Sequence, residues 1–508
     1  MIKTLRQAVF LRLTLFFVSG ILVQTQINLF PYWIYGVAFS LLILLLAFFP
    51  KITASYRWRW LSGFGLFLLC VSVAWILTYT ARKQTDWNEE TGIQTYRVQV
   101  IDDPVRKPKT WMCKATAGDK TVLIYLPVDS VSSTLLPSDW IDIKAHFEKT
   151  DQMYLWKEGI AARVFVYKDN WKKSENPPEQ SFNLHFYSLK CRRIVIDRFK
   201  EMLPDEKSFA VAAAITFGYV DELDKDVRQI FATTGTAHIL SISGLHFAIL
   251  YGALNFLFSF MGNNRRGRFA KQLIILPLLW IYAFFTGMPP AVTRSVIMIT
   301  FWGIGNAFSF RGLTINTLGA TAFLMLLYNP FILYDIGFQL SFTAVLAILL
   351  INPYLSALYH SRNPMINYVW EMSCTSISAQ FGTAPISLYY FHRFPLLFLI
   401  GNIFAVPLSG ILMLLAPLSL FISFVLGNRF GLMFPLQKSM QLFINGLNLL
   451  AEVPHGVVSD IQLTAKDALN LALGLIFSFL LVIKRRLIYL CLLLILVILQ
   501  VLYYLCTK

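Results

Sequence analysis

Charged residues are scarce in this 508-residue sequence. They make up 14% of the chain, whereas hydrophobic residues reach 56%; an average soluble domain is about 25% charged. This scarcity excludes an ordinary soluble enzyme and a disordered or collagen-like chain. Many separate apolar stretches approach the roughly 20 residues that a helix needs to cross a bilayer. The sequence therefore predicts an α-helical membrane protein with roughly ten to twelve spans, some of them broken.

Several motifs of common enzyme chemistry are missing as well. The seven histidines form no HxH, HxxxH or HExxH spacing, and the six cysteines form no CxxC pair, which excludes the usual zinc sites. No GxxxxGK[ST] loop is present, so any transport must draw its energy from elsewhere. Cys113 is the single cysteine of the long polar stretch, and no disulfide can form within that stretch. We expect no metal ion, no cofactor and no catalytic residue.

Acidic residues are few relative to basic ones. The chain has 44 Lys and Arg against 28 Asp and Glu, a formal charge of +16. Between residues 91 and 180 the two signs nearly balance, at 13 basic and 12 acidic residues, so the excess lies on the membrane part. Positive cytoplasmic loops and contact with anionic lipid explain such an excess. A polyanionic substrate is the alternative.

The alternation of apolar and polar segments divides the chain into four regions. Three spans fill residues 1–80, a polar domain follows at 91–180, amphipathic connecting helices cover 181–232, and the remaining spans occupy 233–508. The first 22 residues resemble a signal peptide without a cleavage site, so we expect a retained first span. Lys3, Arg6 and a basic loop at 51–59 indicate a cytoplasmic N-terminus, which puts the polar domain on the extracytoplasmic side.

The polar domain has the pattern of a small all-β fold. Five short strands are predicted at 96–101, 111–117, 120–127, 139–147 and 159–167. Apolar residues recur at every second position of the last two. Five strands in so short a stretch are typical of a closed barrel of the OB type. Such a domain either contacts nucleic acid or serves as a rigid scaffold.

Nine further spans are predicted after the polar domain, near residues 237–260, 273–287, 292–308, 313–328, 338–352, 368–389, 396–426, 469–483 and 487–503. The run at 396–426 is long and contains Pro407, Gly410 and Pro417. We therefore expect it to form two half-spans. Basic turns at 265–268 and 484–486 mark two cytoplasmic connections.

The densest polar cluster lies at the mouth of the first of these spans. Within residues 233–246 the chain carries two histidines, two serines, three threonines and two glycines, among them His238, Ser241, Ser243, Gly244 and His246. Polar groups inside a membrane are costly and are therefore functional candidates. A broken helix here would line a cavity or be buried in protein. Tight helix packing through small residues is the alternative explanation.

Other candidates lie on later spans. Arg294 follows Pro289-Pro290 and enters an apolar helix about one turn after its start; it would either snorkel or grip phosphate with its planar fork. Gln339 and Asn402 lie near the starts of two further spans. Together these residues make successive spans polar on one side, which favours a shared water-accessible pathway.

Two other functions fit parts of this pattern. Ser243 and His246 are three residues apart and would meet on a helix, as an intramembrane hydrolase needs, but a third catalytic member is missing. Polar broken helices also suit a permease for a smaller anionic metabolite.

The polar clusters resemble the signature of the ComEC family of competence proteins. The similarity covers essentially the whole chain and rests on the following segments: FAVAAAITFGYVDELDKDVRQIFATTGTAHILSISGLHFAI at 209–249, then Gly287, Pro290 and Arg294, Asn329-Pro330 with Asp335-Ile-Gly-Phe-Gln-Leu-Ser-Phe, and Phe391-His-Arg-Phe-Pro with Asn402 and Val406-Pro407. Many members of this family end in a metallo-β-lactamase-like domain. This sequence stops after its last apolar run and has no HxHxDH, so we expect that domain to be absent.

The resemblance implies a channel of the bacterial inner membrane that admits single-stranded DNA during natural transformation. Its implied partners are the lipid bilayer, a periplasmic DNA receptor, a cytoplasmic translocation motor and a separate nuclease. His238, Ser241, Ser243, Gly244, His246, Arg294, Gln339 and Asn402 would then line the DNA path or its constriction.

Overall fold

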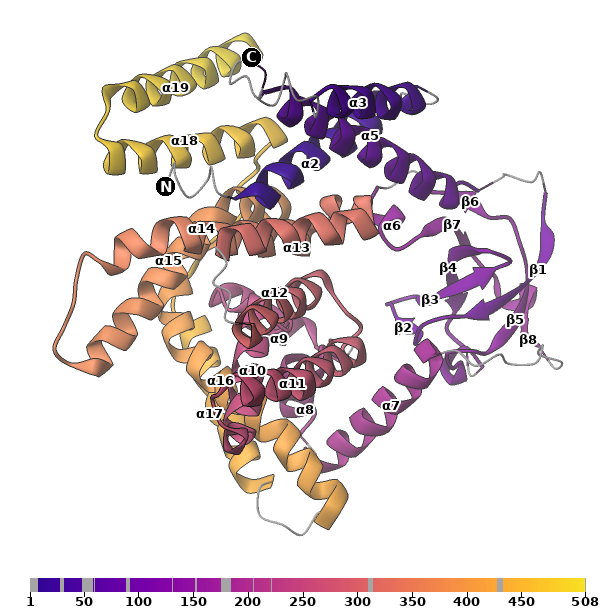
Figure 1. The fold of residues 1–508 in the computed structure, drawn as a ribbon. Coiled ribbons are helices and arrows are strands. Elements are labelled where there is room, and N and C mark those ends of the chain that lie inside the picture. Colours follow the sequence, from indigo (N-terminus) through magenta and orange to yellow (C-terminus); the bar gives the residue numbers. More distant parts are fainter. Residues whose placement is uncertain are drawn as a thin grey trace. The chain divides into compact units, whose positions relative to one another are not determined.

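A computed structural model describes the chain except residues 1–7, 28–31, 48–57, 59, 88–91, 130, 151–152, 175–183, 204, 221, 309–313, 427–432 and 508. The basic residues from which we inferred a cytoplasmic N-terminus, at positions 3, 6, 51, 57 and 59, lie outside the described residues. The chain divides into two compact units, one formed by Met1–Arg198 with Asn255–Phe338 and the other by Phe199–Leu254 with Gln339–Lys508 (Figure 1). Each unit therefore joins two segments that are distant in sequence.

The first unit combines apolar helices with the β-domain. Its membrane helices are α2 (Val9–Ile27), α3 (Trp33–Ala47), α5 (Trp60–Gln84), α11 (Arg265–Phe285), α12 (Pro290–Ala307) and α13 (Thr314–Tyr328), followed by the 3₁₀ turn η6 (Pro330–Tyr334). Helices α2 and α13 pack closely because Gly319 has no side chain: an added Cβ would lie 2.5 Å from the backbone nitrogen of Leu11. The Thr14 hydroxyl donates to the Gly319 carbonyl at 2.8 Å, which joins the two helices.

The β-domain is a single mixed sheet. Its strands are β1 (Gln94–Val100), β2 (Val105–Arg106), β3 (Thr110–Ala117), β4 (Lys120–Pro127), β5 (Trp140–Ala145), β6 (Glu148–Lys149), β7 (Ile160–Phe165) and β8 (Trp171–Lys173), with the short helix α6 (Met153–Trp156) between β6 and β7. The strand order is β6-β7-β4-β3-β1-β5-β8, and β4 and β7 are parallel. Strand β6, at one end of this order, follows β5, near the other end, after only two residues. The sheet therefore curves so that its two ends lie near each other. The all-β prediction is confirmed; the OB type itself stays a prediction.

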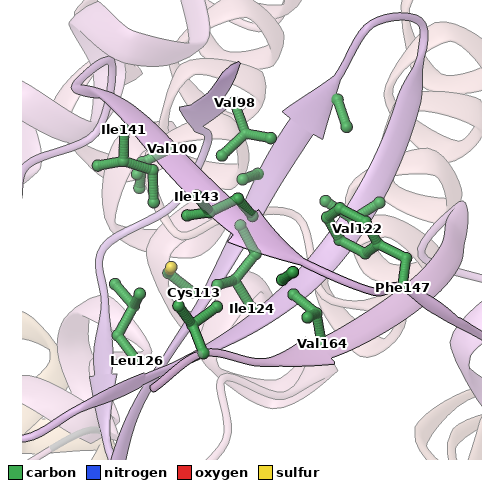
Figure 2. Close-up of a cluster of buried hydrophobic side chains, with 14 of the residues drawn as sticks. Val98, Val100, Cys113, Val122, Ile124, Leu126, Ile141, Ile143, Phe147 and Val164 are labelled. Carbon is green, nitrogen blue, oxygen red and sulfur yellow. The ribbon is translucent and has the colours of Figure 1, made fainter. Parts of the chain in front are cut away.

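Alternation of apolar residues builds the core of this domain. Val122, Ile124 and Leu126 of β4 are fully buried, as are Ile141 and Ile143 of β5. Figure 2 shows these side chains converging with those of β1, β3 and β7 on one cluster. Successive side chains of a strand point to opposite faces, which is why every second residue belongs to the core.

The second unit is helical. It contains α8 (Glu206–Phe217), α9 (Lys225–Thr233), the 3₁₀ turn η4 (Ala237–Ile239), most of α10 (Gly244–Leu257), α14 (Ile336–Ser356) from Gln339 onwards, α15 (Pro364–Phe391), α16 (Phe398–Leu426), α17 (Met433–Ala451), α18 (Ala465–Lys484) and α19 (Leu487–Thr507). The first three residues of α14 belong to the first unit. The short strands β9 (Phe394–Pro395) and β10 (Val457–Val458) pair antiparallel. The amphipathic helix α7 (Leu184–Met202), which connects the β-domain to α8, was expected from the sequence.

One sequence prediction is wrong in this unit, and one helix was not predicted. Helix α16 is continuous through Pro407 and Pro417 and does not form two half-spans; its buried Leu412, Met413 and Ala416 show that packing outweighs the cost of the prolines. Helix α17 was missed because polar residues interrupt its apolar run. It buries four apolar residues at helical spacing, Leu436, Met440, Phe443 and Leu447, and this periodicity was the available signal.

The described helices fit a protein that crosses the membrane several times. Six of them are long and apolar enough to span a bilayer, and four shorter apolar helices accompany them. The chain is therefore a multi-pass membrane protein with an inserted β-domain.

Candidate functional site

The polar cluster at 233–246 forms a break between two helices of the second unit. Helix α9 ends at Thr233, the turn η4 follows, and α10 begins at Gly244. Gly235 has a φ of +73°, a conformation that glycine adopts without strain. A Cβ at this position would lie 2.7 Å from Cβ and 2.8 Å from Cα of Phe398, at the start of α16. The break therefore depends on glycine both for its backbone angle and for its close approach to α16.

Two threonines secure this contact from inside the turn. Thr234 and Thr236 are fully buried, and their hydroxyls are 2.8 Å apart. On the facing helix, a Cβ added to Gly401 would lie 2.4 Å from the Thr234 carbonyl oxygen. The T-G-T segment therefore lies directly on the backbone of α16. The sequence reasoning missed Gly401, for which its position beside the candidate Asn402 was the available signal.

Ser243 and His246 start helix α10 together. The Ser243 backbone N–H donates to Nδ1 of His246 at 3.1 Å, as the third residue of a helix often accepts from the residue that precedes the helix. His246 is 1% exposed, whereas Ser243 is half-buried. Nδ1 faces the backbone of Ser243, so the neutral ring carries its hydrogen on Nε2 and offers a donor there. This arrangement does not direct Nδ1 towards the Ser243 hydroxyl as a general base.

His238 and Ser241 lie in the irregular stretch before α10. Both are exposed. The His238 ring bonds to the backbone of Gly235, and the Ser241 hydroxyl donates to the His238 carbonyl at 3.2 Å. These contacts fold the stretch around its own backbone and leave polar groups on its surface.

Asn402 lies on the helix against which the T-G-T segment packs. It is 8% exposed, and its Nδ2 donates to the Ser376 hydroxyl of α15 at 3.3 Å. Its Oδ1 is buried and accepts no hydrogen bond from the described residues. A buried amide oxygen without a donor costs about 1–3 kcal/mol, so this position suits a donor supplied by water or by a ligand.

The ends of neighbouring helices meet near this break. His392 ends α15 in a left-handed conformation, and its Nδ1 lies 3.1 Å from the Ile461 carbonyl oxygen. Arg393 donates to the Gln229 side chain of α9 at 2.8 Å. These residues, which the resemblance includes in its signature, join the starts of α16 and α18 to α9.

The structure gathers six of the eight candidates in one place. His238, Ser241, Ser243, Gly244 and His246 share one segment, and Asn402 lies on the helix that packs against it. Gln339 is half-buried in the first turn of α14. Arg294 belongs to the first unit.

Arg294 occupies the position that the sequence predicts. Helix α12 begins at Pro290, so Arg294 lies one turn inside it. The Thr293 hydroxyl donates to the Met288 carbonyl at 2.9 Å and thereby closes the turn that precedes the helix. Arg294 is 6% exposed. Like His246, Arg294 is therefore buried, and a shared water-accessible path along both residues stays a prediction.

Acidic, histidine and cysteine side chains do not cluster as metal ligands do. Within the part of the chain that the structure describes, no three such groups come together. The polar cluster offers hydrogen-bond donors and acceptors, among them the hydroxyls of Thr234, Thr236 and Ser241.

Comparison with known proteins links these residues to one family. The sequence profile of a family described as competence protein matches residues 215–501, more than half of the chain. ComE operon protein 3 of Bacillus subtilis is 26% identical over 295 residues, which cover 58% of this chain and 36% of the relative. Recombination protein 2 of Haemophilus influenzae is 28% identical over 274 residues, which cover 52% of this chain and 33% of the relative.

An uncharacterized protein of Aquifex aeolicus is 29% identical over 276 residues, which cover 53% of this chain and 60% of the relative. The chain therefore spans less than two thirds of the length of each of these curated relatives. No solved structure matches it. The matched segment includes the T-G-T break, Arg294, Gln339 and Asn402.

Proposed function

The chain belongs to the competence protein family, and we propose that it forms the inner-membrane channel through which single-stranded DNA enters the cytoplasm during natural transformation. The observation that carries this proposal is the gathering of polar side chains at the break between α9 and α10. Thr234, Thr236, His246 and Asn402 are all buried there, where the amphipathic helix α9 and the apolar helices α10 and α16 meet. Polar groups at such depth are costly unless they serve a path or a binding site.

The chemistry of the candidates suits a nucleic-acid strand. Phosphate oxygens accept hydrogen bonds, and the guanidinium of Arg294 and Nε2 of His246 are donors. Attraction between basic groups and phosphate is independent of base sequence, as the uptake of arbitrary DNA requires. The basic excess of the membrane part provides the same attraction on a larger scale.

The distribution of basic residues supports an orientation for the second unit. Helix α18 has Thr464 at its N-terminal cap and Lys484 in its last turn, beside Arg485 and Arg486. Basic connections face the cytoplasm, which puts the opposite end of α18, and with it the contact of His392 with Ile461, on the extracytoplasmic side. The T-G-T break would then receive DNA from outside.

DNA import in a transformable host tests the proposal. We expect Arg294→Ala and His246→Ala each to reduce the arrival of labelled DNA in the cytoplasm at least about tenfold, since a hydrogen bond to a charged group contributes about 1.5–3 kcal/mol. Protein abundance in the membrane is measured in parallel. Arg362→Ala, at an exposed arginine between α14 and α15, is the matched control and should leave import unchanged.

Normal import by both variants at normal abundance would remove these residues from the mechanism. A knockout that imports DNA normally but loses uptake of one anionic metabolite would instead identify a permease. The periplasmic receptor, the cytoplasmic motor and the separate nuclease belong to the same proposal, because a channel for one strand requires delivery, pulling and removal of the other strand.

A further inference from the structure

Lys157 joins the β-domain to the membrane part of the first unit through both its side chain and its backbone. Its side-chain ammonium pairs with Oδ2 of Asp335. Its backbone carbonyl accepts a hydrogen bond from Nδ2 of Asn329 at 2.7 Å. Lys157 directly follows the short helix α6, and the two partners flank η6. Asn329 and Asp335, which both belong to the signature segment, therefore bind Lys157 through its backbone and its side chain.

Each of these two partners also caps a helix. Oδ1 of Asn329 accepts from the Phe331 backbone N–H at 3.0 Å, in the first turn of η6. Oδ1 of Asp335 accepts from the Phe338 backbone N–H at 2.8 Å, in the first turn of α14. In both residues one side-chain atom fixes a helix start while the other holds Lys157. The position of the β-domain is thereby linked to the first turn of α14.

Aromatic side chains pack beside the contacts of Lys157 with Asn329 and Asp335. The ring of Trp156 meets that of Phe331 edge to face, with centroids 5.3 Å apart. The Arg82 guanidinium, near the end of α5, lies 5.2 Å from the Trp156 ring centroid. Phe331 and Trp156 are 1% and 8% exposed. The side chain of Asp335 is 7% exposed and that of Lys157 23%, so loss of the Lys157 charge would leave the Asp335 carboxylate largely buried without its partner.

Exposed contacts between the β-domain and the end of α5 are of a different kind. Lys149 pairs with Asp86, but their side chains are 39% and 54% exposed. Such surface pairs contribute little to stability. The Lys149 pair is therefore a matched control for the Lys157 pair within the same domain.

We propose that Asn329 and Asp335 are positioning residues that couple the seating of the β-domain on Lys157 to the first turn of α14. This inference rests on the proposed function, because the next residue of α14 after Phe338 is Gln339, one of the candidates for the DNA path. When Asn329 and Asp335 both bind Lys157, their capping contacts are fixed, and the first turn of α14 keeps its position. When these contacts are lost, the β-domain and the start of α14 loosen together.

Hydrogen–deuterium exchange on the purified full chain, without DNA, tests the coupling. Lys157→Gln should accelerate amide exchange at least about tenfold, both in residues 155–157 and at Phe338, since an uncompensated buried charge is strongly destabilising. Exchange in α16 should not change. Asp335→Asn keeps an oxygen that can cap α14 but loses the charge, so it should accelerate exchange at residues 155–157. Lys157→Arg should restore protection, and Lys149→Gln should have no effect.

Faster exchange near residue 157 with unchanged exchange at Phe338 would overturn the coupling, and so would an equal effect of Lys157→Arg and Lys157→Gln. The same variants are then assayed for DNA import. Coupled exchange with reduced import in Lys157→Gln supports the positioning role, and coupled exchange with normal import refutes it. Failure of the unaltered protein to import DNA would refute the proposed function while leaving the exchange result intact.

Discussion

At the scale of single residues, side chains that are absent or small determine the geometry of the candidate site. Gly235 and Gly401 allow a turn and a helix to touch through their backbones. Polar residues then satisfy the groups that this approach buries, as the Thr234 and Thr236 hydroxyls do for each other. The site is therefore built from close backbone packing first, and the histidines and Asn402 are placed by it.

We expect Gly235→Ala to destabilise the protein. A left-handed backbone costs a non-glycine residue about 1–3 kcal/mol, and the new Cβ would also collide with Phe398. Thermal unfolding of the purified protein measures the loss. Gly252→Ala is the control, since a Cβ at that helical position meets nothing within 4 Å and alanine favours the helix by up to about 1 kcal/mol. Equal unfolding temperatures for both variants would refute the packing argument.

Cys113 should be protected from thiol reagents in the folded β-domain. Its side chain is 2% exposed, and burial raises the pKa of its thiol from 9.0 to about 12. The folded state thus disfavours the thiolate, so its stability should decline as the pH rises from about 9 towards about 12. Maleimide labelling of single-cysteine variants measures the protection of the thiol. Exposed Cys191 should react at a pH of about 8 and Cys113 should not; rapid labelling of Cys113 there would contradict its burial.

At the scale of elements, polar side chains at the helix starts show where the helices begin. His246 accepts at the start of α10, Asp335 at the start of α14 and Asp467 at the start of α18, where Thr464 completes a capping box. Each satisfies a backbone N–H that the helix leaves without a partner. Polar residues that look like isolated ligands in the sequence therefore also define where spans begin.

The hairpin of α18 and α19 depends on one polar residue. The Gln500 side chain bonds to Asp467 and to Asn470 of the facing helix. We expect Gln500→Leu to weaken the hairpin by about 1–2 kcal/mol, because interhelical hydrogen bonds in membranes are of this size. Proteolysis or unfolding of the purified protein measures the change. Gln441→Leu, at an exposed glutamine of α17, should be neutral, and a larger effect at residue 441 would contradict the assignment.

At the scale of the whole molecule, the main question is which side of the membrane each helix end faces. The β-domain contacts η6 through Lys157, so the connection between α13 and α14 shares its side. By the positive-inside rule, we expect the basic start of α11, with Arg265 and Arg266, to lie on the cytoplasmic side. These two statements make the orientation of the first unit testable.

Cysteine labelling in intact cells should report this orientation. In a background without the native exposed cysteines, Lys168→Cys in the β-domain should react with a membrane-impermeant maleimide. Arg266→Cys should react only after permeabilisation. Both native side chains are exposed, so access to reagent depends on the side of the membrane alone. The opposite labelling pattern would invert the proposed orientation.

The class of fold and most of the elements can be predicted from the amino-acid pattern alone. Low charge and long apolar runs predicted a multi-pass helical protein, and alternation as in Ile141 and Ile143 predicted the strands, because hydrophobic burial follows the period of each element. The resemblance named the family. Pro407 and Pro417 led to the wrong prediction of two half-spans, because local helix propensity does not include the packing that keeps α16 continuous.

Contacts between residues that are distant in the sequence depend on how the chain packs. Lys157 and Asp335 are 178 positions apart, and nothing in the local pattern of either predicts their ion pair. Likewise, Gly401 gains its meaning from the Thr234 carbonyl across a helix contact. Periodicity records which face of an element is buried, but the partner on that face depends on how the whole chain packs.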